Sequence, residues 1–138
     1  MSISEIENEI LEEFSMFDDW MEKYEHIIEL GKELPIISET QKTDENIIKG
    51  CQSRVWLHAE KEGENISYSA DSDAIITKGI IGLLIRVLNG ETIENVATAN
   101  LFFISKIGLQ EHLSPTRANG LASMVKKIKM TALSSLSK

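Results

Sequence analysis

The chain contains a single cysteine, Cys51, in the stretch IIKGCQSRVWLHAE. One thiol cannot form an internal disulfide, and it lacks the second thiol that a dithiol oxidoreductase needs. A zinc or iron–sulfur site takes three or four ligands, which one cysteine and the scattered His26, His58 and His112 do not supply. A Cys-His hydrolase needs a base oriented by a third group, and none of these histidines has a recognisable pairing with Cys51. A carrier that accepts a group, holds it and passes it on needs only one nucleophilic sulfur.

The neighbours of this cysteine leave two interpretations open. Free cysteine is among the most buried residue types, which favours a structural role. However, Lys49 and Arg54 lie close in sequence, and a cation near a thiol favours the thiolate, its reactive form. Gly50 lets the backbone change conformation, and Gln52 and Ser53 add polar side chains. The residues alone do not decide between an inert and a reactive thiol.

The elements that position the cysteine follow from hydrophobic periodicity. Apolar residues recur at helical spacing over Ile3–Phe14 and again over Phe17–Ile28, which predicts two helices. The segment Ser15–Asp18 resembles a helix-start signal, and Gly31 should end the second helix. The polar stretch over residues 35–50 predicts an irregular loop.

Just after the cysteine, the hydrophobic period changes to two. Residues 54–60 alternate, KEGEN provides a turn with glycine, and residues 66–70 alternate again, which predicts a hairpin. Ile47 and Ile48 are candidates for a third strand. Three strands with a helix packed on one face can be stable where a lone hairpin cannot.

The stretch DSDAIITKGIIGLLIRVLNG, residues 71–90, predicts a central helix because it is apolar nearly all round. Ser72 or Asp73 is expected to cap its first turn. Gly79 and Gly82 cost helix propensity, so we expect them to permit close approach of a neighbouring backbone.

The remaining C-terminal part predicts further helices. Short helices are expected around Thr92–Ala97 and Asn100–Lys106, before a long helix that Ser114 caps and Pro115 begins. Helices, a strand meander and then helices make an α+β fold, with a small three-stranded antiparallel sheet packed against helices. The length predicts one domain over residues 1–138.

Composition narrows the partners and the location. A net charge of −8 argues against nucleic acid and favours a partner with a basic surface. Acidic residues dominate residues 5–33 and basic ones residues 117–138, which indicates either solvated helix faces or a polarised docking surface. The N-terminus lacks signal-peptide features, and the longest apolar run, residues 74–88, is too short for a membrane span. One cysteine fits a reducing compartment, so the cytoplasm is the expected location.

Four segments, taken together, resemble a known family. GCQSRVW, residues 50–56, is similar to the active loop of the SufE proteins, the sulfur acceptors of iron–sulfur cluster assembly. SDAIITKGIIGLL, residues 72–84, HLSPTRANGLASM, residues 112–124, and YEHIIELGKELP, residues 24–35, resemble other segments of that family in the same order. The match covers nearly the whole chain.

The resemblance implies a mechanism and a fold. A pyridoxal-phosphate cysteine desulfurase of the SufS kind would form a persulfide, and Cys51 would take its outer sulfur and pass it to a scaffold such as SufBCD. The chain itself would need no cofactor and no metal, and would act as a transfer partner that stimulates a desulfurase rather than as a stand-alone enzyme. The implied fold is the SufE/IscU-like α+β fold.

The resemblance also assigns expected roles to the neighbours of the thiol. Arg117, in the first turn of the last helix, is expected near Cys51, where it would stabilise thiolate or persulfide charge. Gly50, Gln52 and Ser53 would support a loop that shelters the sulfur and releases it on docking. Two alternatives remain, namely a CsdE-like paralogue that serves another desulfurase, and a regulatory binding module with an inert cysteine.

Overall fold

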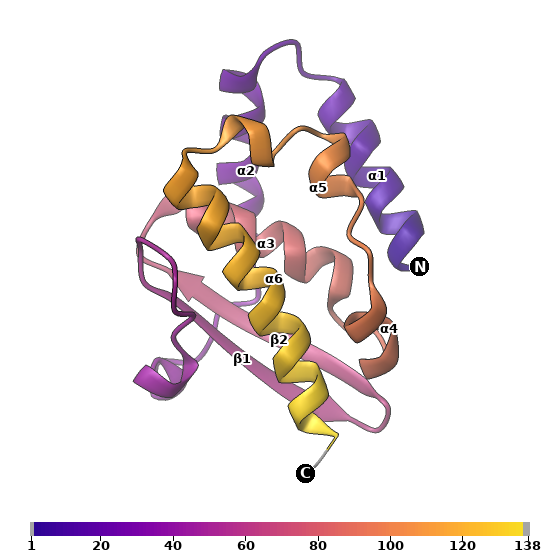
Figure 1. Ribbon diagram of the computed structural model, residues 1–138, viewed down its shortest axis with the longest axis vertical. Coiled ribbons are helices and arrows are strands. Elements are labelled where there is room, and N and C mark those ends of the chain that lie inside the picture. Colours follow the sequence, from indigo (N-terminus) through magenta and orange to yellow (C-terminus); the bar gives the residue numbers. More distant parts are fainter. Residues whose placement is uncertain (1, 137–138) are drawn as a thin grey trace.

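The computed structural model describes residues 2–136 and has an α+β fold (Figure 1). An antiparallel hairpin of β1 (Val55–Glu62) and β2 (Asn65–Ser72) forms the sheet. The α-helices are α1 (Ile3–Ser15), α2 (Trp20–Gly31), α3 (Ile75–Leu88), α4 (Ile93–Thr98), α5 (Phe103–Lys106) and α6 (Pro115–Ser135). Short 3-10 turns lie at Glu39–Gln41, Asp44–Asn46 and Gln110–His112.

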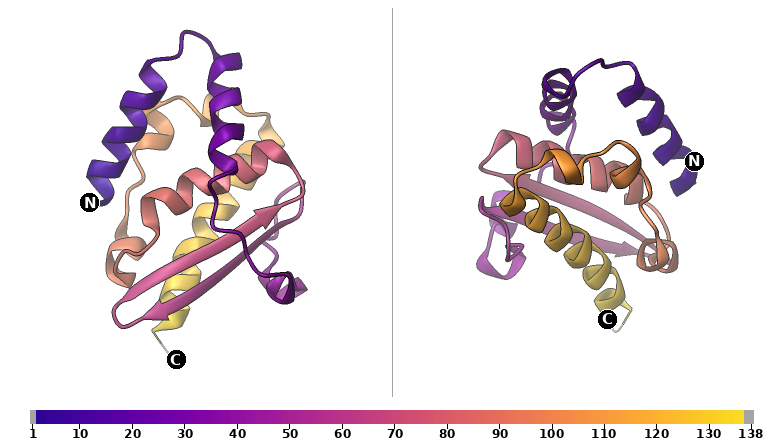
Figure 2. Two further views of the ribbon diagram at one scale, coloured as in Figure 1. Left: turned by 180° about the vertical axis from the view of Figure 1, so that it is seen from behind. Right: turned by 45° about the horizontal axis from the view of Figure 1, so that its top comes forward.

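The inner face of the hairpin carries the core. The register places Leu57 opposite Ala70 and Ala59 opposite Tyr68, and the predicted hairpin is confirmed. Helix α3 packs against β2 and α6 against β1, while α2 covers α3 (Figures 1 and 2). Helices α3 and α6 therefore pack against the sheet and against each other, and the N-terminal helix pair packs on α3.

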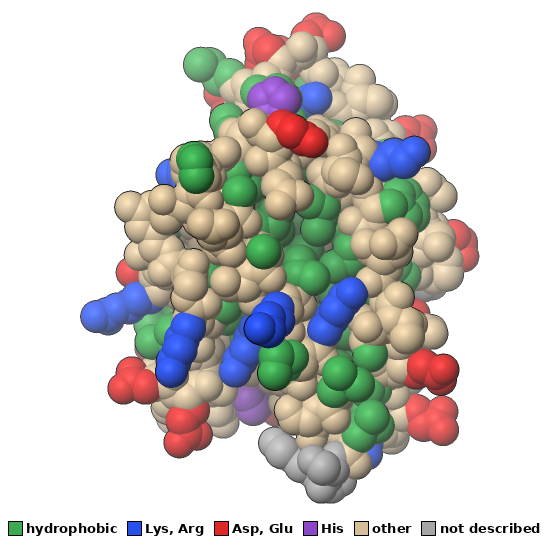
Figure 3. All heavy atoms as spheres, viewed as in Figure 1, with side chains coloured by type: hydrophobic (Ala, Val, Ile, Leu, Met, Phe, Trp, Pro, Cys, Tyr) green, Lys and Arg blue, Asp and Glu red, His purple; other side chains and the backbone are tan. Residues whose placement is uncertain are grey.

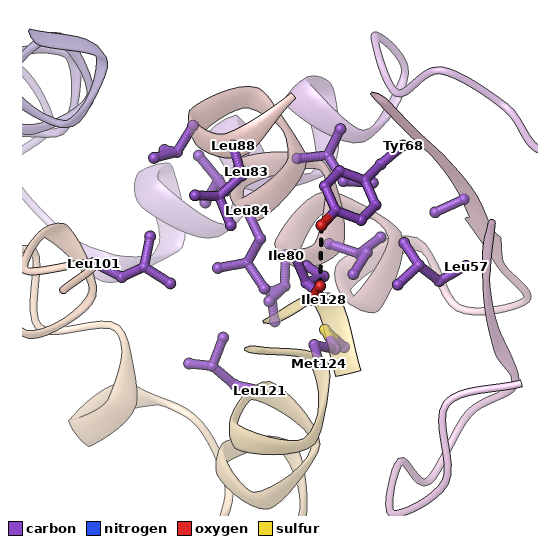
Figure 4. Packing of buried hydrophobic residues seen from close by; sticks show 14 of the residues in the cluster. Leu57, Tyr68, Ile80, Leu83, Leu84, Leu88, Leu101, Leu121, Met124 and Ile128 are labelled. Carbon is purple, nitrogen blue, oxygen red and sulfur yellow. Dashed lines mark hydrogen bonds between the residues drawn. The ribbon is translucent and has the colours of Figure 1, made fainter. Parts of the chain in front are cut away.

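Tyr68 fixes the sheet to α6 inside this core. Its hydroxyl donates a hydrogen bond of 3.0 Å to the carbonyl oxygen of Ile128 (Figure 4). Burial raises the pKa of Tyr68, so the hydroxyl stays a donor at neutral pH. Figure 4 also shows Ile80 of α3 and Met124 of α6 among the buried side chains that fill the space between the two helices.

Close approach between α2 and α3 explains the glycines that interrupt the apolar helix. A Cβ added to Gly79 would lie 2.1 Å from the carbonyl oxygen of Ile27, so no larger residue fits there. Gly82 has more space, since its nearest neighbour would be the carbonyl oxygen of Leu30 at 3.6 Å. The prediction of close packing is confirmed most strongly at Gly79.

The expected third strand is wrong, since the sheet has two strands within residues 2–136. Ile47 forms only an isolated antiparallel bridge with Trp56, and Ile48 donates a hydrogen bond of 2.8 Å to the carbonyl oxygen of Val55. The 3-10 turn at Asp44–Asn46 precedes this pair and a turn at Gly50 follows it. The extended segment is therefore too short to make a strand.

Two predicted helix starts also differ from the structure. Asp19, rather than the Ser15–Asp18 signal, caps α2 by accepting a hydrogen bond from the backbone N–H of Glu22. Neither Ser72 nor Asp73 caps α3, which begins after Ala74 without a side-chain cap. The predicted cap of α6 is confirmed, because the Ser114 hydroxyl accepts from a first-turn N–H and Pro115 begins the helix.

Candidate functional site

The segment 49–53, called the Cys51 loop below, is held at both ends. On one side, the backbone pair between Ile48 and Val55 closes the loop. On the other side, the backbone N–H of Arg54 donates to the Asp73 carboxylate at 3.0 Å, and its carbonyl oxygen accepts from the Ser72 hydroxyl at 2.9 Å. These anchors lie outside the loop itself.

Gly50 sets the conformation of this loop. Its φ of +93° lies in a region that side chains with a Cβ rarely adopt. A Cβ added there would also meet the Ser123 hydroxyl of α6 at 2.5 Å. The loop therefore needs glycine at residue 50 for its backbone angle and for its contact with α6.

Cys51 is half-buried against the second turn of α6. Its Sγ lies 3.6 Å from the carbonyl oxygen of Gly120, to which the thiol donates a weak hydrogen bond. A Cβ added to Gly120 would come within 3.5 Å of Sγ. Gly120 thus packs directly against the thiol.

A small cavity of about 40 Å³ adjoins the thiol. It brings together four of the predicted site residues, namely Cys51, Gln52, Ser53 and Arg117. Its other lining residues were not singled out from the sequence as site residues: Thr77 and Ile80 of α3, and Thr116, Gly120 and Met124 of α6. Thr77 and Thr116 both stand within matched segments, but only the fold shows that they line the same cavity.

Burial and positive charge act on the sulfur in opposite directions. Burial raises the pKa of the Cys51 thiol, which is opposite to the lowering expected from Lys49 and Arg54. The first turns of α3 and α6 both contribute to the cavity, and helix N-termini stabilise negative charge. The guanidinium of Arg117 forms no ion pair with any residue among 2–136. The arrangement holds a neutral thiol at rest beside groups that can stabilise an anion.

The histidines lie elsewhere in the described part of the chain. His26 contacts the Glu13 carboxylate at 3.0 Å, and His112 stacks on Trp20 with ring centroids 4.0 Å apart. His58 lies 3.5 Å from a carboxylate oxygen of the neighbouring Glu60. None of the three lines the cavity, and residues 2–136 contain no group of three or more metal-ligating side chains.

A larger groove of about 470 Å³ lies beside the Cys51 loop, between the loop that precedes it and α6. Lys49, Lys126 and Lys127 line it, and none of them forms an ion pair within residues 2–136. Asp44 and Glu45 line its other side. Figure 3 shows basic side chains gathered across the middle of this face, with acidic ones toward its margins. The face next to the thiol is therefore locally basic on an acidic protein.

The sequence predicts no membrane-spanning segment. Among residues 2–136, no helix combines the length and the apolar character that crossing a bilayer requires.

Comparison with solved structures supports the fold. The solution structure of a hypothetical protein from Thermus thermophilus superposes with a TM-score of 0.79 over 96% of this chain and 97% of that chain. The sequence identity is 22%, so this likeness concerns the fold alone.

Sequence comparisons give the family. Residues 8–132 match the family model described as SufE, Fe-S metabolism associated domain. An uncharacterised SufE-like protein of Rhizobium etli is 42% identical over 130 residues, which cover 91% of this chain and 88% of that protein. SufE-like protein 1, chloroplastic/mitochondrial, of Arabidopsis thaliana is 38% identical over 126 residues, which cover 91% of this chain and 34% of that longer protein. The chain therefore belongs to the SufE family.

Proposed function

We propose that this chain is a sulfur acceptor and carrier of iron–sulfur metabolism. Cys51 takes sulfur from a persulfide on a SufS-like, pyridoxal-phosphate-dependent cysteine desulfurase and passes it to a SufBCD-like cluster scaffold. The observation that supports this most is the position of the one cysteine of a SufE-family chain. Its thiol adjoins a cavity bounded by Arg117 and by the first turns of two helices.

The transfer is a displacement at sulfur. The thiolate of Cys51 attacks the outer sulfur of the donor's persulfide, so that a new S–S bond forms on Cys51 as the old one breaks. The donor's cysteine leaves as a thiolate, which takes up the proton that Cys51 released. No electrons are gained or lost overall, so this step needs no oxidant or reductant.

Shelter and release impose opposite requirements on the loop. A persulfide is easily reduced or oxidised, and a half-buried Sγ against Gly120 suits protection. Attack on a donor in another protein requires the same sulfur to leave α6. The Cys51 loop can provide both states, because its anchors at Val55 and Asp73 lie outside the moving segment.

The groups around the cavity have separate roles in this proposal. Arg117 stabilises the negative charge on the incoming or bound sulfur, while Gln52 and Ser53 meet solvent or the partner when the loop opens. The lysine-lined groove suits an acidic segment of the desulfurase, whereas the overall charge of −8 suggested a basic partner. Local charge next to the thiol is the better guide to what docks there.

The proposal also covers the domain organisation, the cellular compartment and the alternative roles. We infer one SufE-like domain over residues 1–138, working in a reducing compartment such as the cytoplasm, where a lone thiol stays free. A CsdE-like role with another desulfurase uses the same site and differs only in the partner. The alternative of a regulatory module with an inert cysteine leaves the cavity beside Sγ without a function.

Intact-mass spectrometry separates these functions. The protein is incubated with a candidate desulfurase, pyridoxal phosphate and free cysteine, and the mass of the chain is then measured. The carrier gains one sulfur atom, which a reductant removes. A chain that binds the desulfurase and changes its turnover while its own mass stays constant is a regulatory module instead.

A further inference from the structure

Thr77 is a buried polar residue at the wall of the thiol's cavity. It is the third residue of α3 and is 7% exposed, and it lines the same cavity as Cys51. Within residues 2–136, its hydroxyl has no hydrogen-bond partner. By contrast, the helical Thr98 and Thr131 hydroxyls each donate to the carbonyl oxygen four residues earlier, at 2.9 and 2.7 Å.

The hydroxyl of Thr77 is open to the cavity rather than sealed in the core. Every fully buried side-chain oxygen and nitrogen among residues 2–136 has a hydrogen-bond partner, so the small exposed part of Thr77 must include its oxygen. The cavity beside Cys51 is the space that Thr77 lines. A group that enters this cavity can therefore reach the hydroxyl.

The hydroxyl of Thr77 depends on the cavity for a hydrogen-bond partner. Among the described residues no protein group bonds it, so only water or a group that enters the cavity can do so. Valine has nearly the same shape and would leave this wall of the cavity apolar. The hydroxyl therefore gives the cavity a donor that an acceptor bound there can use.

The start of α3 strengthens this argument. No side chain caps the first-turn N–H groups of α3, and the Ser72 hydroxyl accepts only from the backbone N–H of Ala74, just before the helix. The first-turn N–H groups of α3 therefore have no side-chain acceptor. An anion near Thr77 would be favoured by the helix dipole as well as by the hydroxyl.

The size of the cavity limits the occupant. Its volume is about 40 Å³, and roughly 10–15 Å³ of such space suffices for one water molecule. One further sulfur atom bonded to Sγ of Cys51 fits, whereas a peptide or a cofactor does not. The side chains of Ile80 and Met124, which also line the cavity, offer no hydrogen-bond donor.

We infer that the Thr77 hydroxyl donates a hydrogen bond to the outer sulfur of the Cys51 persulfide and stabilises its anionic form. This inference rests on the proposed function, because it assumes that Cys51 carries sulfur. It makes Thr77 a second determinant of how long the sulfur survives. The anion resists attack by cellular thiols, which react with the neutral persulfide as the electrophile, so the hydrogen bond protects the cargo.

The test uses the full chain loaded chemically, so that no desulfurase is needed. Inorganic polysulfide supplies the sulfur: the Cys51 thiolate bonds to one sulfane sulfur, and the shortened polysulfide leaves as an anion. The persulfide is then alkylated with iodoacetamide over a range of pH, and the product is quantified by intact mass. The variants are Thr77→Val, which removes only the hydroxyl, Thr77→Ser, which restores it, and the matched control Thr131→Val, a half-buried threonine of α6 that does not line the cavity.

The expected result is a shifted pH profile. Loss of a hydrogen bond to a charged group should change the acid equilibrium of the persulfide about tenfold, which raises the alkylation midpoint of Thr77→Val by about one pH unit. Thr77→Ser and Thr131→Val should keep the wild-type midpoint. Because the hydroxyl has no protein partner without sulfur, unloaded Thr77→Val should melt no lower than wild type.

Two results would overturn the inference. The first is the same midpoint in Thr77→Val and wild type. The second is a lower melting temperature of unloaded Thr77→Val, because the hydroxyl would then have a structural partner. Failure of the proposed function gives a different result. The wild type would then take sulfur from polysulfide but from no desulfurase. The alkylation midpoints of Thr77→Val and wild type could still be compared on the polysulfide-loaded chains.

Discussion

Replacing Gly50 with alanine should open the Cys51 loop. The φ of Gly50 is +93°, and its added Cβ would lie 2.5 Å from the Ser123 hydroxyl. Both problems exist only while the loop is folded against α6. The substitution therefore strains the sheltered state and leaves the released state unaffected.

The magnitude follows from the two contributions. A non-glycine residue at positive φ costs about 1–2 kcal/mol. The clash adds less, because the Ser123 side chain can rotate away, as its Cβ would be 3.4 Å distant. A cost of one or two kcal/mol changes the ratio of the two loop states by roughly 5- to 30-fold. We expect Cys51 to react with a bulky thiol reagent faster by about that factor.

The assay is labelling of Cys51 under native conditions, followed by mass spectrometry. Gly63 provides the matched control, because its φ is +64° and an added Cβ would contact nothing within 4 Å. Gly63→Ala should lower the melting temperature by about 2–4 °C without changing the labelling of Cys51. Adding Ser123→Ala to Gly50→Ala removes the clash and isolates the backbone cost. Wild-type labelling kinetics in Gly50→Ala would refute the two-state loop.

Three further predictions concern the thiol, the core and the docking face. Because burial raises the pKa of the Cys51 thiol, the thiol stays protonated until the pH passes that raised value, and its alkylation midpoint should lie above the roughly 8.5 of an unhindered cysteine. Gly79→Ala should lower the free energy of unfolding by about 3 kcal/mol in denaturant titrations, since its Cβ would lie 2.1 Å from the Ile27 carbonyl oxygen. Lys126→Glu combined with Lys127→Glu should weaken calorimetric binding to the desulfurase about tenfold at low salt, and the difference should shrink as salt is added.

Each of these has a control and a contradicting outcome. An alkylation midpoint below that of free cysteine would show that positive charge outweighs burial. Gly82→Ala has room for its Cβ and should be neutral or stabilising, so equal effects at Gly79 and Gly82 would contradict the close contact of α2 and α3. Lys61→Glu, on the exposed end of the hairpin, should leave binding unchanged, and a loss equal to that of the double variant would mean that overall charge matters rather than the groove.

Local chemistry made most of the fold predictable. The N-terminal helix pair, the hairpin and the Ser114 cap depend on spacing and on residues that are neighbours in sequence. The prediction of a third strand failed because the pairing of Ile47 with Trp56 is limited to one bridge by the turns on either side of it. The prediction that Asp73 caps α3 failed because its carboxylate accepts a hydrogen bond from the backbone N–H of Arg54, across the loop, instead. In both cases a contact between distant segments decided the outcome.

The part of the site that is local in sequence was predictable. Gly50, Gln52 and Ser53 adjoin Cys51 in sequence, whereas Arg117 was predicted from the resemblance to the family. Nothing in the sequence pattern indicates that Thr77, in an apolar helix, lines the thiol's cavity. The direction of the pKa shift of the thiol was not predictable, because nearby cations are visible in the sequence but burial by α6 is not.

The central claim, that Cys51 carries sulfur, is tested most directly by the mass of the chain after incubation with a cysteine desulfurase, pyridoxal phosphate and free cysteine. Wild type should gain one sulfur atom that maps to the peptide containing Cys51, and reductant should remove it. Cys51→Ser should keep the fold, as shown by its melting temperature, and gain no sulfur, because the chain has no second thiol. Sulfur retained by Cys51→Ser, or a wild-type chain that stays unmodified with every desulfurase it binds, would contradict the account.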